Sequence, residues 1–357
     1  MIALKNVPRL AGLAPRTRSG VNARGACVRM YSQDILIKWK TGMPQVSRGP
    51  VGLGRNSYTG SIATVFGATG FLGRYLVSKL AKIGTQVVVP YRDEDEKRHL
   101  RVLGDLGQIV PLEWDLRNER QIMDCLSNSD TVFNLTGRDY ATNADPNSES
   151  EFLRTKALGE DAVRNAFSGA TVVRPASIYG HEDRFLNKLA SWPITWKLNH
   201  MQTKRRPVHA LDVAQALRII AQSDNASMGQ TYSLAGPKTY TVRELMELTE
   251  GVTYQKLISP DINVPRFLFS IVAGLGERVA WWPMFNKDEV RRRFIDDAPD
   301  APGTKTFADL DITPDVLEDV AIAYLRRYRS FLRYEQPLNN ATPGVVKLKK
   351  TPFRVIE

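Results

Sequence analysis

Three glycines spaced three residues apart, Gly67, Gly70 and Gly73, separate a short apolar segment from an amphipathic one. Residues 62–66 are apolar and favour a strand, whereas residues 71–80 follow a helical pattern. In such a strand–turn–helix the first glycine permits the tight turn, the second lets phosphates approach the backbone, and the third lets the helix pack on the strand. The helix N-terminus then offers free N–H groups to an anion. The segment therefore predicts a cradle for a dinucleotide pyrophosphate, with an ordinary strand–helix turn as the alternative; its residues are Gly67, Ala68, Thr69, Gly70, Phe71, Leu72 and Gly73.

Strand-like and helical segments alternate along the chain after this turn. Apolar, strand-like segments occur at 85–90, 108–116, 130–137, 170–175 and 231–236, and helical patterns at 151–167 and 210–221. Apolar strands that alternate with helices indicate a parallel sheet covered on both faces. We therefore predict an α/β fold, a Rossmann-like doubly wound parallel sheet with a smaller mixed C-terminal domain. The predicted boundaries are 61–235 for the nucleotide-binding domain and 236–336 for the smaller domain.

Arg92, at the end of the second predicted strand, bears on which dinucleotide would bind. At this position an acidic residue would bond the ribose 2′-hydroxyl of NAD, whereas an arginine suits the 2′-phosphate of NADP. Arg92 therefore predicts NADPH as the cofactor, although the neighbouring Asp93 favours the other dinucleotide. A solvated loop charge is the alternative interpretation of Arg92.

Polar residues also follow the third and fourth predicted strands. In open α/β sheets ligands bind at the carboxyl ends of the strands. We therefore predict that Asp115 and the adjacent Leu116 lie at the adenine. The residues expected at the ribose and nicotinamide side are Leu135, Thr136, Gly137 and Arg138.

The positive charge of the chain is concentrated at its N-terminus. The formal net charge is +11, and residues 1–31 carry six basic residues and no acidic one. This composition is typical of a mitochondrial transit peptide, and Arg29 precedes a plausible processing site before Ser32. The remaining chain is only mildly basic, which argues against a nucleic-acid-binding function. Residues 32–60 predict an extended basic arm, and 337–357 an extended tail.

Cysteines and histidines are too few and too scattered to indicate a metal centre. The two cysteines are Cys27 and Cys125, and the four histidines show no close metal-ligand spacing. We therefore expect neither a disulfide framework nor a metal site.

Several motifs together resemble the extended or atypical short-chain dehydrogenase/reductase superfamily. They lie at 67–73, 114–116, 134–137, 174–180 and 207–214. More narrowly, the chain resembles the branch of this superfamily that serves as an accessory subunit of mitochondrial respiratory complex I, of fungal type. The segments that carry this narrower resemblance are 99–108, 112–115, 134–139, 153–160, 182–187 and 325–329.

The resemblance also points to an incomplete catalytic site. Active members of the superfamily carry a tyrosine, which donates the proton, and a lysine four residues later. Here the matching positions are Phe152 and Lys156, so the proton donor is absent and only the ribose-binding lysine remains. We therefore expect no catalytic residue and a chain that binds NADPH without turning it over. The resemblance further places Pro175, Ser177 and Ile178 against the nicotinamide.

The chain is short between the fourth predicted strand and the helix that carries Lys156. A helix and a strand, about 35 residues, are expected there, because a parallel crossover needs a dozen residues or more. Only the polar segment 141–151 is present. Either this variant has lost a crossover, or the sequence lacks a segment near residues 140–143; we favour the second.

Two further segments suggest contacts with partners. Residues 262–285 are the most apolar stretch, which suits either a core helix or a membrane interface. Residues 313–315 predict a helix start, and the helix carries Arg326, Arg327, Arg329 and Arg333 beside its apolar face. This ridge suits an acidic partner or anionic lipid.

The resemblance implies a location and partners for the chain. It implies a peripheral protein on the matrix side of the mitochondrial inner membrane, beside complex I subunits of the matrix arm near the membrane junction. A stand-alone mitochondrial NADPH-dependent reductase or epimerase is the alternative, against which Phe152 argues.

Overall fold

The computed structural model describes most of the chain between residues 59 and 334. The described residues are 59–137, 145–191, 197, 199–223, 227–255, 267, 269–271, 273–274, 287–297, 303–329 and 334, with the backbone of 2–5, 38–40 and 43–45. The chain divides into two compact units, one of residues 1–137, 169–171 and 217–228, the other of residues 138–168, 172–216 and 229–357. The predicted limits of the nucleotide-binding domain, residues 61–235, and of the smaller domain that follows it stay a prediction.

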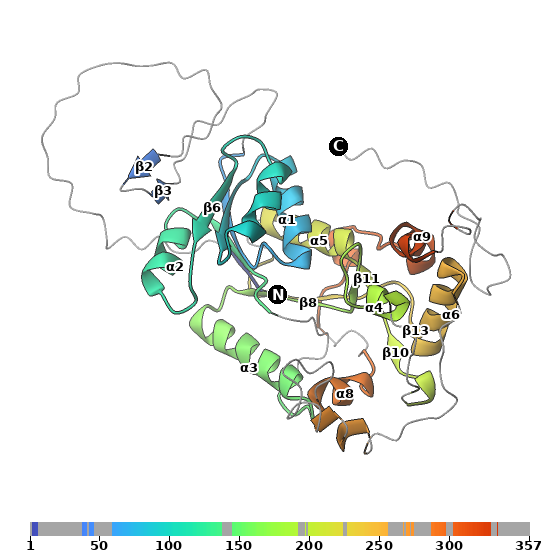
Figure 1. Cartoon of the computed structure of the whole chain (residues 1–357). Helices are drawn as coiled ribbons and strands as arrows, with labels where there is room; N and C mark the ends of the chain where they lie inside the picture. Colours follow the sequence, from blue (N-terminus) through green and yellow to red (C-terminus); the bar gives the residue numbers. More distant parts are fainter. Residues whose placement is uncertain are drawn as a thin grey trace, which may run out of the picture. The chain divides into compact units, whose positions relative to one another are not determined.

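A parallel sheet forms the centre of the first unit (Figure 1). Its four strands are β4 (Ile62–Phe66), β5 (Gln86–Tyr91), β6 (Ile109–Glu113) and β7 (Thr131–Asn134). Their spatial order is β7-β4-β5-β6, and all three pairings are parallel. The segment 62–66 is buried throughout, as expected for a central strand with both faces covered. This arrangement confirms the predicted Rossmann-like α/β fold.

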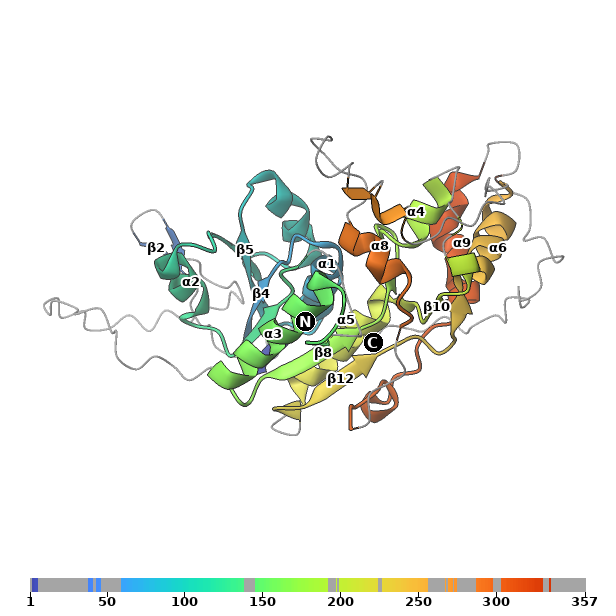
Figure 2. The same cartoon turned by 90° about the horizontal axis from the view of Figure 1, so that it is seen from below.

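Helices cover both faces of these strands. Figures 1 and 2 show α1 (Phe71–Lys82) and α2 (Glu119–Leu126) on opposite sides of the sheet. The side chains of Ile62 and Phe66 pack with Trp114 and Cys125 on the α2 side. A 3₁₀ segment, η1 (Asp95–Leu103), follows β5.

Residues near the N-terminus add a strand to the other edge of β7. Strand β1 (Ile2–Lys5) pairs with β7 in antiparallel register, with Ile2 opposite Asn134. Two further short strands, β2 (Lys38–Lys40) and β3 (Met43–Gln45), form an antiparallel pair within the predicted basic arm. The assignment of 1–31 as a transit peptide stays a prediction.

The second unit combines two pairs of parallel strands with a helical cluster. Its α3 (Glu151–Ala166) precedes β8 (Thr171–Pro175), which pairs with β12 (Thr231–Leu234), and β9 (Ile178–Tyr179) pairs with β11 (Val208–His209). Helix α5 (Ala210–Gln222) follows β11 directly. The remaining elements are α4 (Leu186–Ser191), η2 (Asn199–Met201), β10 (Lys204–Arg205), β13 (Tyr240–Thr241), α6 (Val242–Thr253), α8 (Lys287–Arg293), η4 (Ala308–Leu310), α9 (Leu317–Leu325) and η5 (Arg326–Tyr328).

The core of this cluster lies where α4, α6 and α9 meet, as both views show. Tyr179, Leu245 and Leu325 are fully buried there. Helix α6 begins with the predicted capping box, in which Thr241 and Glu244 cap each other. The sequence was sufficient to predict this helix start, because the two capping residues lie within one helical turn of each other.

The predicted start of α9 is wrong by a few residues. The sequence placed it at 313–315, but the helix begins at Leu317, because Asp315 is engaged with other elements. The predicted basic ridge is also only partly correct. Arg326 and Arg327 are exposed, whereas Arg329 is 7% exposed and donates to the Val252 carbonyl at 2.6 Å.

Some predictions fall outside the described residues. These are Arg138, Arg333, the segment 140–143, the tail 337–357 and most of 262–285. Within the described part of the chain, no helix is both long enough and apolar enough to cross a bilayer.

Candidate functional site

The glycine turn between β4 and α1 is closely built. Gly67 has φ +79°, which favours glycine, and a Cβ there would lie 3.0 Å from the Leu135 carbonyl carbon. A Cβ on Gly73 would lie 2.5 Å from the Gly67 carbonyl oxygen, so the helix approaches the turn backbone directly. Gly70 N–H donates to this same oxygen at 3.1 Å. The roles expected of the first and third glycines therefore have a steric basis in the structure.

The N-terminus of α1 is not capped by a side chain. Its N-cap residue is Gly70, and its first turn contains no acidic residue. The first N–H groups of a helix have no partners within the helix, and the helix dipole places positive charge there. This 12-residue helix can thus offer backbone donors to an external anion such as a phosphate.

Most of the residues predicted to bind the cofactor at the carboxyl ends of the strands belong to this same unit. Leu135 continues the ladder by donating its N–H to the Phe66 carbonyl at 2.9 Å, and Thr136 N–H donates to Asn134 Oδ1 at 3.1 Å. Asp115 is exposed after β6, and its Oδ1 accepts the Arg117 N–H at 3.1 Å. Leu116 is 73% exposed, as are several other single aliphatic side chains of this unit, so its exposure by itself does not indicate a ligand. Arg92 and Gly137 are exposed as well.

The other predicted residues belong to the second unit. Lys156 lies on α3 with its Nζ 5.6 Å from the centre of the Phe152 ring. Pro175 ends β8 and Ile178 begins β9, both buried, with the half-buried Ser177 between them. The predicted site residues are therefore divided between the two units. The first unit contains Gly67–Gly73, Asp115, Leu116 and Leu135–Gly137, and the second contains Lys156, Pro175, Ser177 and Ile178.

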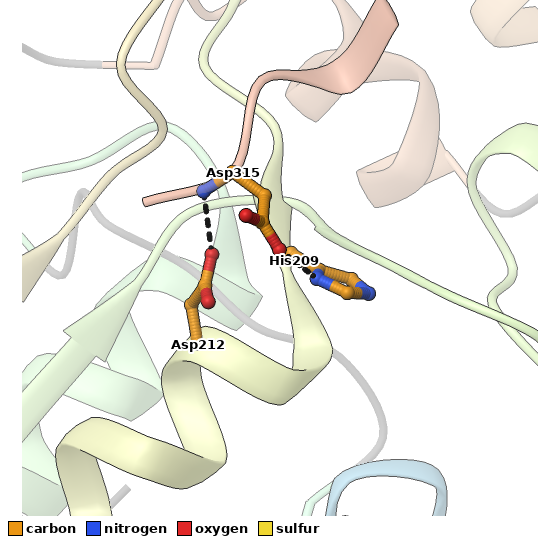
Figure 3. Close-up of side chains that lie close together, drawn as sticks. All are labelled: His209, Asp212 and Asp315. Atoms are coloured by element: carbon orange, nitrogen blue, oxygen red, sulfur yellow. Dashed lines mark hydrogen bonds and ion pairs between the residues drawn. The ribbon is translucent and has the colours of Figure 1, made fainter. Parts of the chain in front are cut away.

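A second polar cluster connects α5, β11 and the segment before α9 (Figure 3). The Asp315 carboxylate lies 3.0 Å from His209 Nδ1, and the Asp212 carboxylate accepts the Asp315 N–H at 2.7 Å. His209 Nε2 lies 2.6 Å from the Tyr324 hydroxyl, and the Tyr179 ring stacks on the imidazole at 5.2 Å. Burial, then the charges of Asp212 and Asp315, raise the pKa of the Tyr179 phenol.

The composition of this cluster suggests a metal site, but its bonding does not. One ligand-type atom each from His209, Asp212 and Asp315 lies within 4.8 Å of the others. However, both ring nitrogens of His209 already have protein partners, and Asp212 is bonded to a backbone N–H. A histidine that binds a metal needs one nitrogen for the ion. The cluster therefore serves to hold the start of α9 against β11 and α5.

Sequence reasoning did not find this cluster, because Asp315 lies 106 residues from His209. The only local signal was Asp212 in the first turn of α5. Cys125 behaves as expected of a core residue, since burial raises the pKa of its thiol to about 12.

Two family models and several mitochondrial proteins match the chain. The model of the NAD dependent epimerase/dehydratase family matches residues 63–184, and that of the RmlD substrate binding domain matches residues 126–248. The mitochondrial NADH-ubiquinone oxidoreductase 40 kDa subunit of Neurospora crassa is 43% identical over 350 aligned positions, which cover 88% of this chain and 91% of that protein. The mitochondrial NADH dehydrogenase (ubiquinone) 1 alpha subcomplex subunit 9 of Rattus norvegicus is 34% identical, with 82% and 86% covered.

Solved structures show the same fold at low identity. A crystal structure of isoflavone reductase matches with a TM-score of 0.57 and 17% identity, covering 75% of this chain and 99% of that one. The binary complex of leucoanthocyanidin reductase with NADPH from Vitis vinifera matches with a TM-score of 0.55 and 13% identity, covering 74% and 99%.

Proposed function

The chain belongs to the family of the mitochondrial NADH-ubiquinone oxidoreductase 40 kDa subunit, and from this premise we propose that it is an accessory subunit of respiratory complex I that binds NADPH without turning it over. The observation that carries the proposal is the alignment, which extends over nine-tenths of the fungal relative. The relatives from Rattus norvegicus and Arabidopsis thaliana bear names of the same complex.

The turn after β4 supports a bound dinucleotide. A Cβ at position 67 or 73 would strike backbone atoms, and the uncapped α1 offers its first N–H groups to a phosphate. The exposed Arg92 would take the 2′-phosphate of NADPH, and Asp115 with Leu116 the adenine. Residues 135–138 would line the ribose and nicotinamide side. Lys156, Pro175, Ser177 and Ile178 belong to the second unit, and their assignment to the cofactor rests on the family resemblance alone.

The absence of a proton donor at position 152 supports a non-catalytic role. A phenyl ring has no exchangeable proton, so Phe152 cannot protonate a carbonyl oxygen during hydride transfer. Bound NADPH would then act by stabilising the folded chain, because a ligand that binds only the native state shifts the folding equilibrium. The competing hypothesis is a stand-alone mitochondrial reductase or epimerase, which requires a different proton donor.

The mitochondrial relatives also support a proposal about location. We infer a peripheral protein on the matrix side of the mitochondrial inner membrane, in contact with other complex I subunits of the matrix arm near the membrane junction. Contact with anionic lipid through residues 262–285 and the basic end of α9 belongs to the same proposal. Phe267 is 70% exposed and Ile271 is 43% exposed one helical turn later, which supports an apolar contact there.

Native extraction tests the proposal. Mitochondrial membranes are solubilised in a mild detergent, and the protein is isolated and analysed by mass spectrometry for what co-purifies. We expect complex I subunits and NADPH. Recovery of the chain as a free monomer, or of an active reductase, would contradict the assignment.

We also infer that the natural chain contains a crossover between β7 and α3 that this sequence lacks. The alignment with the fungal relative has 350 positions and covers 88% of the 357 residues of this chain, which is about 314 residues. About 36 of the aligned positions therefore have no residue in this chain. That number fits one helix and one strand. The edge of β7 that faces away from β4 supports the inference, because it pairs antiparallel with residues 2–5, whereas the pairings among β7, β4, β5 and β6 are all parallel.

Peptide mapping decides this point. Trypsin cleaves after Arg138 and Arg154, so this sequence predicts one peptide that spans residues 139–154. We expect the natural protein to give longer or additional peptides in its place. Detection of the 139–154 peptide itself as the major product would contradict the inference.

A further inference from the structure

The N-terminus of α3 is closed by a carboxylate from a distant part of the chain. Asp288, at the start of α8, accepts the N–H of Glu151 at 2.8 Å and the hydroxyl of Ser150 at 2.9 Å. The N–H of Phe152 points at the same carboxylate at 3.4 Å. The N-cap residue Ser150 makes no side-chain cap bond of its own. Asp288 therefore supplies the cap, from 137 residues beyond Glu151 in the chain.

The same helix covers the ring of Phe152. The Arg292 guanidinium carbon lies 4.5 Å from the ring centre, a stacking distance that leaves no room for a further layer of atoms. Arg291 donates to the Glu149 carbonyl at 3.2 Å. We call these three side chains, Asp288, Arg291 and Arg292, the α8 clamp; the side chains of Asp288 and Arg292 are each 24% exposed.

Contacts on its other sides hold α8 in place. Val290 is fully buried against Phe269, Ala273 and Phe294. Glu289 pairs with Lys188 of α4 at 2.9 Å, and Arg205 donates to the Arg292 carbonyl at 3.1 Å. The clamp is thus part of the packed second unit, fixed by apolar burial and by charge-assisted hydrogen bonds.

We propose that the α8 clamp closes position 152 to carbonyl substrates, so that Asp288 and Arg292 are residues that determine substrate exclusion. This inference rests on the proposed non-catalytic cofactor site and deepens it. A carbonyl that receives a hydride must reach the proton donor at position 152. Arg292 covers one face of the half-buried Phe152 ring, and a tyrosine placed there would be stacked in the same way. Two independent features therefore oppose turnover: the missing hydroxyl removes the proton donor, and the clamp restricts access of the substrate.

Amide hydrogen exchange tests the clamp directly and needs no cofactor. Asp288→Ala should raise the exchange rates of the Glu151 and Phe152 amides at least tenfold, and Asp288→Asn, which keeps one acceptor oxygen, should raise them less. Glu247→Gln is the matched control, because Glu247 is exposed on α6 and pairs with Arg243. Unchanged exchange in both Asp288 variants contradicts the proposal.

Activity measurements then test what the clamp does. We expect Phe152→Tyr to bind NADPH, as followed by its fluorescence, and to reduce no member of a panel of aldehydes and ketones. Turnover by Phe152→Tyr with α8 intact overturns the inference. Failure of the wild-type chain to bind NADPH instead contradicts the proposed function, and leaves the exchange experiment valid.

Discussion

The N-termini of α1 and α3 differ in what neutralises their positive ends. The N-cap residue of α1 is Gly70, which has no side chain to cap the helix. The neighbouring Gly67 and Gly73 lie too close to other backbone atoms to carry a Cβ, so no side chain from these positions covers the turn. At α3 a carboxylate from α8 already takes the free donors, and a guanidinium covers the adjacent ring. One helix can thus receive an anion from outside, whereas the other has received one from within the chain.

The difference separates two properties that usually occur together in this fold. Holding a dinucleotide requires an open helix N-terminus and a close backbone approach, which the turn 67–73 provides. Hydride transfer also requires a proton donor that a substrate can reach, and in our proposal that position is occupied by Phe152, which lies against Arg292. The comparison therefore supports cofactor binding and argues against catalysis.

The largest effect is expected from Gly73→Ala. Its Cβ would lie 2.5 Å from the Gly67 oxygen and 2.6 Å from the Ala68 backbone, so the turn must shift. We expect a loss of about 3 kcal/mol in the free energy of unfolding, measured by urea denaturation. Gly159→Ala on α3 is the matched control, since a Cβ there meets nothing within 4 Å, and it should stabilise by about 0.5–1 kcal/mol. A Gly73→Ala protein as stable as the control would disprove the close approach of helix and turn.

Gly70→Ala should separate stability from cofactor binding. The backbone of Gly70, with φ −72°, suits alanine, and its Cβ would meet only the Gly67 oxygen at 3.2 Å. We expect a change in stability below about 1 kcal/mol, but a loss of NADPH affinity of about tenfold or more, because the methyl group stands where the phosphates approach. Calorimetric titration with NADPH measures the affinity; an unchanged value would show that the phosphates lie elsewhere.

Arg92→Ala should change which dinucleotide binds. If Arg92 pairs with the 2′-phosphate, its removal lowers affinity for NADPH by about tenfold, about 1.4 kcal/mol, and leaves affinity for NADH unchanged. Competition titrations with the two cofactors give the ratio. Equal losses for both would assign Arg92 to another part of the cofactor.

The smallest effect concerns the ion pair that holds α8. Burial raises the pKa of Glu289, but the hydrogen bond and charge of Lys188, together with Arg293, outweigh it and hold the pKa below the ordinary 4.5. Because the folded-state pKa is the lower one, the contribution to stability is complete above pH 4.5 and is lost as the pH falls through the folded value. Glu289→Gln should therefore cost about 1 kcal/mol near pH 7 and less in acid. A cost that does not change with pH would contradict the ion pair.

Local patterns predicted the elements on which the first unit is built. The strand 62–66, the glycine turn and the helix from Phe71 follow one another within 21 residues, so each is indicated by a pattern of residues that are close in sequence. The capping box of α6 was predictable for the same reason. The assignment of Phe152 to the proton-donor position rests on the resemblance alone and stays a prediction, because a phenylalanine on an amphipathic helix carries no functional signal of its own.

The contacts that close α3 could not be predicted, because they join residues 137 positions apart and depend on how α8 packs. The start of α9 was misplaced for a similar reason. Thr313, Pro314 and Asp315 are a good local signal for a helix start, but Asp315 bonds to His209 and Asp212 instead. Arg329 was assigned to an exposed ridge, whereas its guanidinium reaches the Val252 carbonyl.

The most direct test of binding without catalysis uses one preparation of the wild-type protein. NADPH fluorescence is followed first in a titration and then over time with a panel of aldehydes and ketones. We expect saturable binding of NADPH and no oxidation above the rate without protein. Steady oxidation of NADPH, or an absence of binding, would contradict it.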